Sequence, residues 1–504
     1  MKRIGTALLI LVMGLLLLGA AAPAQEGKAA DAPKVPEPQA AGPQASEAKA
    51  PESAAGGEPK AGEAAKAAEG EKTEAPAAQP LKPEAAAKTI TGKVIDAATK
   101  KPIAEAPVTL GDRQVRTDQG GAFRIEGSGE TLKLRAAGYK RREVPLSDLQ
   151  GVNPEIALEP FKVRALYLTV YGSASKNLRT AALETLERNN MNALVIDIKG
   201  DRGFIPFKVD IPLAEEAGAQ KTILFKDYAA FIKSLKDRNL YLIARIVVFK
   251  DDPLAAAKSQ WAVKTKGGGV FYDRERLRWI DGFHTEAWNY YISLAKIGAE
   301  LGFDEIQFDY VRFPDNRGVA LAKPSTVENR TKAITGFLEA AYQALIPYNV
   351  FVAADVFGYV PWNTHDTDIG QQIGPITKAV DIVSLMVYPS GYHLGIPKYR
   401  NPVQHPYEIV YLTHKKALER TQVSPLRFRP WLQAFRDYAF RGGDFTEERM
   451  RIQIKAAEDF GASGFMFWNP RNIYPTGVFY HGEGKKQAKR PPEAETAAAS
   501  SPGK

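Results

Sequence analysis

The sequence predicts an α/β fold, a (β/α)8 TIM barrel preceded by a small β-sandwich. From residue 161 onward, short apolar runs alternate with amphipathic helical stretches, as in a parallel sheet covered by helices. No glycine-rich phosphate loop follows the first run, which disfavours a dinucleotide-binding sheet. The apolar runs number eight, the strand count of the barrel. We expect these strands at residues 163–170, 193–198, 241–248, 305–308, 350–354, 382–387, 429–432 and 464–467.

The stretches between these runs are long enough for the helices of a barrel. We interpret these stretches as helical. The clearest predicted helices are residues 178–189, 225–238, 285–301, 327–345, 407–420 and 446–460.

Composition excludes several classes of function. The chain has 504 residues, of which 44% are hydrophobic and 25% charged, so it can bury a large core. The formal net charge is +9, but the Lys and Arg residues are scattered and no nucleic-acid motif accompanies them. The chain has no Cys, which excludes disulfides, a thiol nucleophile and a lipid-modified cysteine. We therefore expect no nucleic-acid partner, and a monomer whose stability comes from packing.

The N-terminal region predicts export. Residues 1–24 read as a signal peptide, with Lys2 and Arg3, a long apolar run, and small residues around Ala24. The run is long enough that an uncleaved membrane anchor is the alternative, and no other membrane association is expected. We therefore place the protein in the periplasm, cell envelope or extracellular space.

Three further segments are defined by composition. Residues 25–87 are rich in Ala, Pro, Glu and Lys and contain no aromatic residue, which predicts a disordered linker. Residues 482–504 read as a disordered tail. Residues 88–160 contain short alternating runs separated by turn clusters such as 118–121, which predicts the β-sandwich.

The order of residues in this predicted sandwich resembles the carboxypeptidase regulatory-like domain. The resemblance depends on Gly92, Val94, Asp96, Pro102, Ile103, Val108, Leu110, Thr117, Asp118, Gly121 and Phe123. Such domains are accessory, so the resemblance implies binding or spacing rather than chemistry.

The segment 302–315, GFDEIQFDYVRFPD, is the centre of the predicted barrel, which spans residues 161–481. Ile306 and Phe308 alternate with Glu305, Gln307 and Asp309, the pattern of a strand with two different faces. Asp309 ends this strand, and the carboxyl ends of the strands form the catalytic rim of a TIM barrel. If Asp309 points into the barrel, Glu305 and Gln307 do as well.

The same alternation brings more polar residues to the barrel interior. It turns inward Asp197, Lys199, Arg245, Asp355, Ser384, Tyr388, Gln433 and Trp468. A purely structural barrel would fill these positions with branched aliphatic residues. Asp309 and Asp355 lie on adjacent strands and repel one another, so one pKa should rise, as the roles of acid and nucleophile require. We therefore predict Asp309 and Asp355 to be catalytic.

The other inward residues have two interpretations. Asp197, Lys199 and Arg245 either orient a substrate and tune the two acids, or form an ion-pair network that only satisfies itself. Gln307 is expected to form a hydrogen bond with Arg245.

Aromatic residues concentrate at or just beyond the predicted strand ends, where flat rings with polar tips stack on sugars or simply pack. They are Tyr171, Trp279, Tyr310, Tyr359, Trp362, Tyr388, Tyr392, Trp431 and Trp468. Their concentration at one rim favours a carbohydrate-binding groove. The complete predicted substrate-binding set is Asp197, Lys199, Arg245, Tyr310, Arg312, Trp362, Tyr388, Gln433 and Trp468.

Residues 161 to about 480 resemble the bacterial "putative glycosyl hydrolase" domain family. The segments that carry this resemblance are VRALYLTVYG, ALVIDIKGDRG, FDEIQFDYVRFPD, VAADVFGY and GFMFWNP. More distantly, the region is similar to the alpha-amylase superfamily, which implies that Asp309 is the nucleophile and Asp355 the acid. The superfamily has Glu where Asp355 stands and Arg where Gln307 stands. Arg245 or Arg312 could supply the missing guanidinium.

The same segment also resembles the DxxDxDxE strand of the chitinases, but the comparison fails at the residue that matters. Asp304, Gln307, Asp309 and Val311 occupy the four motif positions. Val311 stands where that family has its catalytic Glu, and a valine cannot donate a proton. Substrate-assisted chitinase chemistry is therefore disfavoured.

Other chemistries lack their motifs. The six His residues form neither HxH nor HExxH, and GxSxG and Walker sequences are missing from the chain. Asp366 and Asp368 could bind calcium, but a solvated acidic loop explains them more simply. We predict no metal and no cofactor.

Together these features predict an exported glycoside hydrolase that acts on a polysaccharide or oligosaccharide. A retaining enzyme would hold the two carboxyl groups about 5 to 5.5 Å apart, and an inverting enzyme about 6.5 to 9.5 Å. One alternative is a barrel that binds carbohydrate without cutting it. Another is a structural envelope protein in which the linker and sandwich perform the function.

Overall fold

The computed structural model describes residues 87–151 and 153–482. The predicted export signal, nearly all of the predicted linker and nearly all of the predicted C-terminal tail lie outside these residues.

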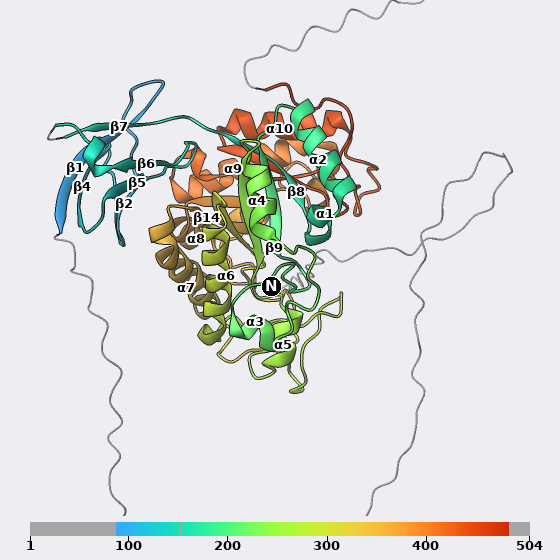
Figure 1. The fold of residues 1–504 in the computed structure, drawn as a ribbon. Helices are drawn as coiled ribbons and strands as arrows, with labels where there is room; N and C mark the ends of the chain where they lie inside the picture. The colour runs from blue at the N-terminus through green and yellow to red at the C-terminus, as the bar shows by residue number, and fades with distance from the viewer. Residues whose placement is uncertain (1–86, 152, 483–504) are drawn as a thin grey trace, which may run out of the picture. The chain divides into compact units, whose positions relative to one another are not determined.

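The centre of the fold is a closed barrel of eight parallel strands that follow one another in chain order, which confirms the predicted TIM barrel (Figure 1). Arg245 of the third barrel strand lies beside Gln307 of the fourth. The barrel strands are β8 (Val163–Leu168), β9 (Ala193–Lys199), β10 (Tyr241–Val247), β12 (Glu305–Asp309), β14 (Phe351–Phe357), β15 (Ile382–Met386), β16 (Trp431–Gln433) and β17 (Gly464–Trp468).

Helices surround the barrel. They are α1 (Val170–Ala174), α2 (Lys176–Arg188), α3 (Pro212–Glu216), α4 (Tyr228–Lys236), α5 (Asp252–Ala257), α6 (Trp288–Glu300), α7 (Val327–Leu345), α8 (Ile373–Ala379), α9 (Pro406–Thr421) and α10 (Glu447–Phe460). The N-caps follow from sequence: the Thr326 side chain accepts a hydrogen bond from the Asn329 amide at the start of α7. In the described part of the chain, no helix combines the length and the apolar character needed to span a bilayer.

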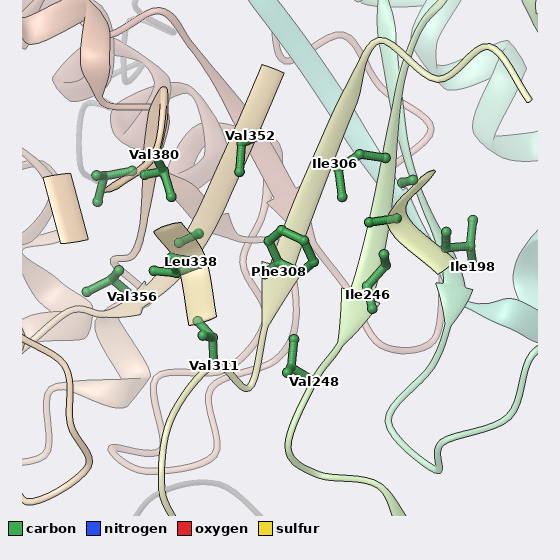
Figure 2. Close-up of a cluster of buried hydrophobic side chains, with 14 of the residues drawn as sticks. Ile198, Ile246, Val248, Ile306, Phe308, Val311, Leu338, Val352, Val356 and Val380 are labelled. Carbon is green, nitrogen blue, oxygen red and sulfur yellow. The ribbon is translucent and has the colours of Figure 1, made fainter. Parts of the chain in front are cut away.

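The large core lies between the barrel and the helices. Figure 2 shows Ile246, Phe308 and Val352 from three neighbouring strands on the same side as Leu338 of α7. Ile306 and Phe308 are fully buried in this layer, as the alternation along β12 predicts. The remaining residues of β12 therefore face the barrel interior.

The N-terminal strands form two sheets that pack on a common core. One sheet has the order β4-β1-β7 and the other the order β3-β2-β5-β6. Val94 and Ile125 of the first sheet share a core with Val108 and Leu132 of the second, so the arrangement is a sandwich. The strands are β1 (Lys88–Asp96), β2 (Pro107–Leu110), β3 (Arg113–Arg116), β4 (Ala122–Gly127), β5 (Thr131–Leu134), β6 (Arg142–Pro145) and β7 (Glu155–Leu158).

Candidate functional site

Strand β12 sends one polar side chain into each of three layers of the barrel interior. In the layer at the amino end, Glu305 pairs with Arg429 at 2.5 Å. In the middle layer, Gln307 donates a hydrogen bond to Ser384 Oγ at 3.1 Å. The expected bond between Gln307 and Arg245 is therefore wrong. Asp309 occupies the layer at the carboxyl end, where the catalytic rim of a TIM barrel lies.

Arg245, fully buried on β10, is the centre of this last layer. Its Nη2 lies 2.5 Å from Asp309 Oδ2, and its Nη1 lies 2.7 Å from Asp197 Oδ1. Nη2 also donates a hydrogen bond to Asp201 Oδ1 at 3.0 Å. One guanidinium thus binds three carboxylates. Arg245 supplies the positive charge beside Asp309 that Gln307, a neutral residue, cannot supply.

Asp355 of β14 faces the same layer but has a different environment. Trp431 Nε1 donates a hydrogen bond to Asp355 Oδ1 at 2.7 Å, whereas Oδ2 is buried and has no hydrogen-bond partner within residues 87–151 and 153–482. Burial raises the pKa of Asp355 well above its usual value, and the nearby charge of Asp309 raises it further, against the opposing effect of Arg245. Asp355 therefore keeps its proton to a higher pH than an ordinary aspartic acid does.

The two carboxyl groups lie close together. Arg245 Nε is 3.0 Å from Asp309 Oδ2 and 4.0 Å from Asp355 Oδ2. The two Oδ2 atoms are therefore within roughly 7 Å of each other, a limit that includes the separation of about 5 to 5.5 Å found in retaining glycosidases and the lower part of the inverting range.

The backbone after Asp309 is held in a rarely occupied conformation. Tyr310 has φ of 50°, in the left-handed region that residues other than glycine seldom adopt. This turn brings the Tyr310 amide to 2.6 Å from Asp309 Oδ1. Strain of this kind concentrates at functional sites, and here it fixes the orientation of the carboxylate.

Aromatic rings form the walls around Arg245 and Asp355. Tyr167 and Trp468 stack on one another at 3.9 Å, and the Arg245 guanidinium lies 4.8 Å from the Trp468 ring. On another side, Tyr388 contacts Phe435, which stacks on Tyr438. Tyr438 is 40% exposed, so this row of rings runs from the buried layer to solvent.

Lys199 is not part of the Arg245 cluster. Its ammonium pairs with Asp251 at 2.9 Å and lies 5.2 Å from the Tyr291 ring. The cause is a register shift in which Arg245 lies beside Asp197 but Ile246 lies beside Lys199. Because residues paired in this way point to the same side, Lys199 faces the helix layer with Ile246, and its predicted inward orientation is wrong.

Two further residues that were predicted to bind substrate, Trp362 and Gln433, form hydrogen bonds within the protein instead. The Trp362 indole donates a hydrogen bond to Thr413 of α9 and packs on the outer core, away from Asp309. Gln433 uses its amide on Ser390 and on the Phe435 carbonyl, so it fixes the loop after β15.

Arg312 lies at the rim. Its guanidinium carbon is 4.8 Å from the Trp279 ring, 5.1 Å from the Tyr310 ring and 4.8 Å from the Phe357 ring. The structure thus gathers Asp197, Arg245, Asp309, Asp355, Tyr388 and Trp468 in one layer, with Tyr310 and Arg312 above Asp309.

The sequence-based site lacked three residues that the structure adds. Asp201 binds Arg245, Tyr167 donates a hydrogen bond to Asp197 Oδ2 at 2.6 Å, and Trp431 holds Asp355. Tyr167 lies on the inward face of β8, so the alternation rule could have found it. Asp201 lies in the turn after β9, beyond the register shift, where the rule does not apply. Burial raises the pKa of Asp197 to about 6, against the charge of Arg245.

His365, Asp366 and Asp368 lie close enough together to suggest a metal site. However, Arg330 donates to both carboxylate oxygens of Asp366, at 2.6 and 2.8 Å. This bidentate ion pair already uses the ligand atoms that a cation would need.

Comparison with known proteins identifies the barrel region. The family described as "Putative glycosyl hydrolase domain" matches residues 165–474. No curated protein matches the chain.

Three solved structures resemble parts of it. A hypothetical protein from Ruminiclostridium thermocellum is 35% identical over 38% of this chain and 97% of its own, with a TM-score of 0.34. The PgaB (BpsB) glycoside hydrolase domain from Bordetella bronchiseptica is 16% identical over 62% and 95%, with a TM-score of 0.45. A chitinase from Chromobacterium violaceum is 11% identical over 61% and 94%, with a TM-score of 0.36.

Proposed function

This chain belongs to the family described as "Putative glycosyl hydrolase domain", and from this premise we propose that its barrel hydrolyses a glycosidic bond with Asp309 and Asp355. The observation that carries the proposal is the contrast between two neighbouring carboxyl groups. Asp309 is ion-paired with Arg245, whereas Asp355 is buried and its pKa is raised. Glycosidases need such a pair, with one ionised carboxylate and one protonated acid.

The proposed reaction assigns a proton to each step. The Asp309 carboxylate attacks the anomeric carbon while Asp355 gives its proton to the departing glycosidic oxygen, so the sugar becomes esterified to Asp309. Asp355, now ionised, takes a proton from water, and the resulting hydroxide attacks the anomeric carbon and releases Asp309. Arg245 holds Asp309 in position for both steps.

The test is a screen of the purified protein against bacterial wall and extracellular polysaccharides, with released reducing ends as the readout. On any polysaccharide that is cleaved, Asp309→Asn should lower kcat at least about 10³-fold, because the amide cannot act as a nucleophile. Asp315→Asn, the same change at an exposed position of the following loop, is the matched control and should retain full activity. Turnover by Asp309→Asn at a rate close to that of the wild type would refute the assignment.

The second candidate function is carbohydrate binding without hydrolysis. It is favoured by the burial of Asp355, whose side chain is 1% exposed, so that a substrate reaches this acid only after neighbouring side chains move. Binding that persists in Asp309→Asn, together with no reducing ends released by the wild type, would support this function.

We further propose that the protein is exported and that the sandwich serves as an accessory module, with envelope or extracellular polysaccharide as the substrate. Support comes from the sequence of residues 1–24 and from the resemblance of residues 88–160 to regulatory-like domains. Mass measurement of the protein recovered from cell fractions would test both export and cleavage of the signal.

A further inference from the structure

Arg312 differs from the other buried arginines among residues 87–151 and 153–482. It is 8% exposed and lies three positions after Asp309. Its hydrogen bond within this part of the chain runs from Nη1 to the Phe313 carbonyl, at 3.0 Å. Each of the others has a carboxylate partner: Arg135 pairs with Asp381, Arg245 with Asp197, Asp201 and Asp309, Arg330 with Asp366, and Arg429 with Glu305.

Three aromatic rings fix the position of this unpaired cation. Tyr310 follows β12, Phe357 ends β14, and Trp279 bridges to Lys250 just beyond β10. Arg312 therefore lies at the rim between the strands that carry Arg245, Asp309 and Asp355. The rings contact the guanidinium through cation–π interactions and restrict its motion, while Nε and Nη2 keep no partner among the described residues.

The acidic residues near Arg312 form ion pairs with a different cation, Lys250. Lys250 lies 5.0 Å from the Tyr310 ring and pairs with Glu275 at 3.0 Å and Asp273 at 3.7 Å. The charge of Lys250 is thus compensated by protein side chains, whereas Arg312 has no carboxylate partner in the part of the chain that the structure describes. Keeping a cation buried and unpaired is unfavourable unless an anion binds there.

We propose that Arg312 binds an anionic group on the glycan, a carboxylate, sulfate or phosphate, next to the bond that Asp309 attacks. The inference rests on the proposed function, because the position of the anionic group is defined relative to the bond that Asp309 attacks. It implies that the substrate is an acidic polysaccharide. A planar guanidinium with two free donors matches two oxygens of such a group, which a neutral sugar does not offer.

The experiment measures binding rather than turnover. Saturation-transfer NMR on the full-length protein would compare D-glucuronate with its methyl ester, and glucose 6-sulfate and glucose 6-phosphate with glucose. At least one charged sugar should bind roughly tenfold more tightly than its neutral counterpart, and Arg312→Gln should abolish that preference. The one that binds identifies the anion. Arg317→Gln removes the same charge from an exposed position of the same loop and should leave binding unchanged.

Equal binding of charged and neutral sugars by the wild type would overturn the inference, as would a preference that survives in Arg312→Gln. If Arg312→Gln does not fold, Arg312→Lys provides the second test, because it keeps the charge without the planar fork and should retain only part of the preference. Anion preference in a protein that releases no reducing ends would uphold the role of Arg312 and refute hydrolysis. Cleavage of a neutral glycan without anion preference would uphold hydrolysis and refute the role of Arg312.

Discussion

The two ends of the barrel interior each hold a buried arginine, but only one end balances its charge. At the amino end, Arg429 pairs with Glu305 alone, and Tyr241 donates a hydrogen bond to the same carboxylate at 2.9 Å. At the carboxyl end, Arg245 binds Asp197, Asp201 and Asp309, and Asp355 lies 4.0 Å away. A matched pair holds a barrel together, whereas an excess of acids raises the pKa of one of them, here Asp355. An excess of carboxyl groups over basic groups at one end of the barrel therefore indicates a functional site better than the presence of a buried charge does.

The largest effect should come from Arg245→Gln, which removes the cation shared by three carboxylates. Leaving these acids without their partner should lower the free energy of unfolding by about 3–5 kcal/mol, as for other broken buried ion pairs. Hydrolysis should also be lost, because Asp309 would no longer be held. Urea denaturation and a reducing-end assay measure the two effects. Unchanged stability would show that Arg245 is not the organising charge.

Breaking the matched pair should affect stability alone. Glu305→Gln leaves Arg429 buried without a carboxylate and should cost about 3 kcal/mol, while the folded fraction keeps its kcat. The double variant Glu305→Leu with Arg429→Met removes both charges and should recover most of the loss, since apolar replacement of a buried pair is often neutral. A fall in kcat at 20 °C, with the protein fully folded by circular dichroism, would contradict the separation of the two ends.

Asp355→Asn should stabilise the protein at neutral pH while it abolishes hydrolysis. Below the usual Asp pKa of about 3.9, residue 355 is neutral in both folded and unfolded chains, so the wild type and the variant should be equally stable. As pH rises, the unfolded wild type ionises while burial keeps the folded carboxyl protonated, because its pKa is raised. The wild type should thus lose roughly 1.4 kcal/mol for each pH unit up to the raised pKa, and the variant should not.

Thermal unfolding of both proteins between pH 3.5 and 8 measures this difference. Asp197, whose pKa is raised to about 6, contributes the same trend to both proteins and cancels in the comparison. In the wild type, kcat should fall as pH rises through the pKa of Asp355, because the acid is then deprotonated. Parallel stability curves would mean that Asp355 is already ionised in the folded protein.

Much of the fold could be predicted from sequence because strand alternation determines which side a residue faces. The alternation of Ile306 and Phe308 with Glu305, Gln307 and Asp309 was sufficient to define the two faces of β12. The rule fails where the backbone departs from regular pairing. The shift beside Ile246 sends Lys199 outward, and no periodicity governs the loop that carries Trp362.

The sequence also could not predict which side chains form hydrogen bonds with one another inside the barrel. Gln307 lies beside Arg245 in the register, yet its amide bonds to Ser384 and approaches Met466 across the barrel. Such choices depend on the size and direction of side chains from several strands at once. The pairing of Asp309 with Arg245 belongs to the same kind, since the comparison with the alpha-amylase superfamily left both Arg245 and Arg312 as partners.

The smallest expected effect comes from Tyr167→Phe, which tests whether Tyr167 only supports Asp197 or takes part in the reaction. Tyr167 donates a hydrogen bond to Asp197, and this bond opposes the rise in the pKa of Asp197 that burial causes. Tyr167→Phe should lower the free energy of unfolding by about 1 kcal/mol, the usual net value of one hydrogen bond. It should also raise the pKa of Asp197 above about 6, which carbon-detected NMR of the carboxyl group can follow. Tyr290→Phe is the control, because the Tyr290 hydroxyl is buried and none of the described residues forms a hydrogen bond with it. A kcat that falls with Tyr167→Phe as steeply as with Asp309→Asn would place Tyr167 in the reaction itself.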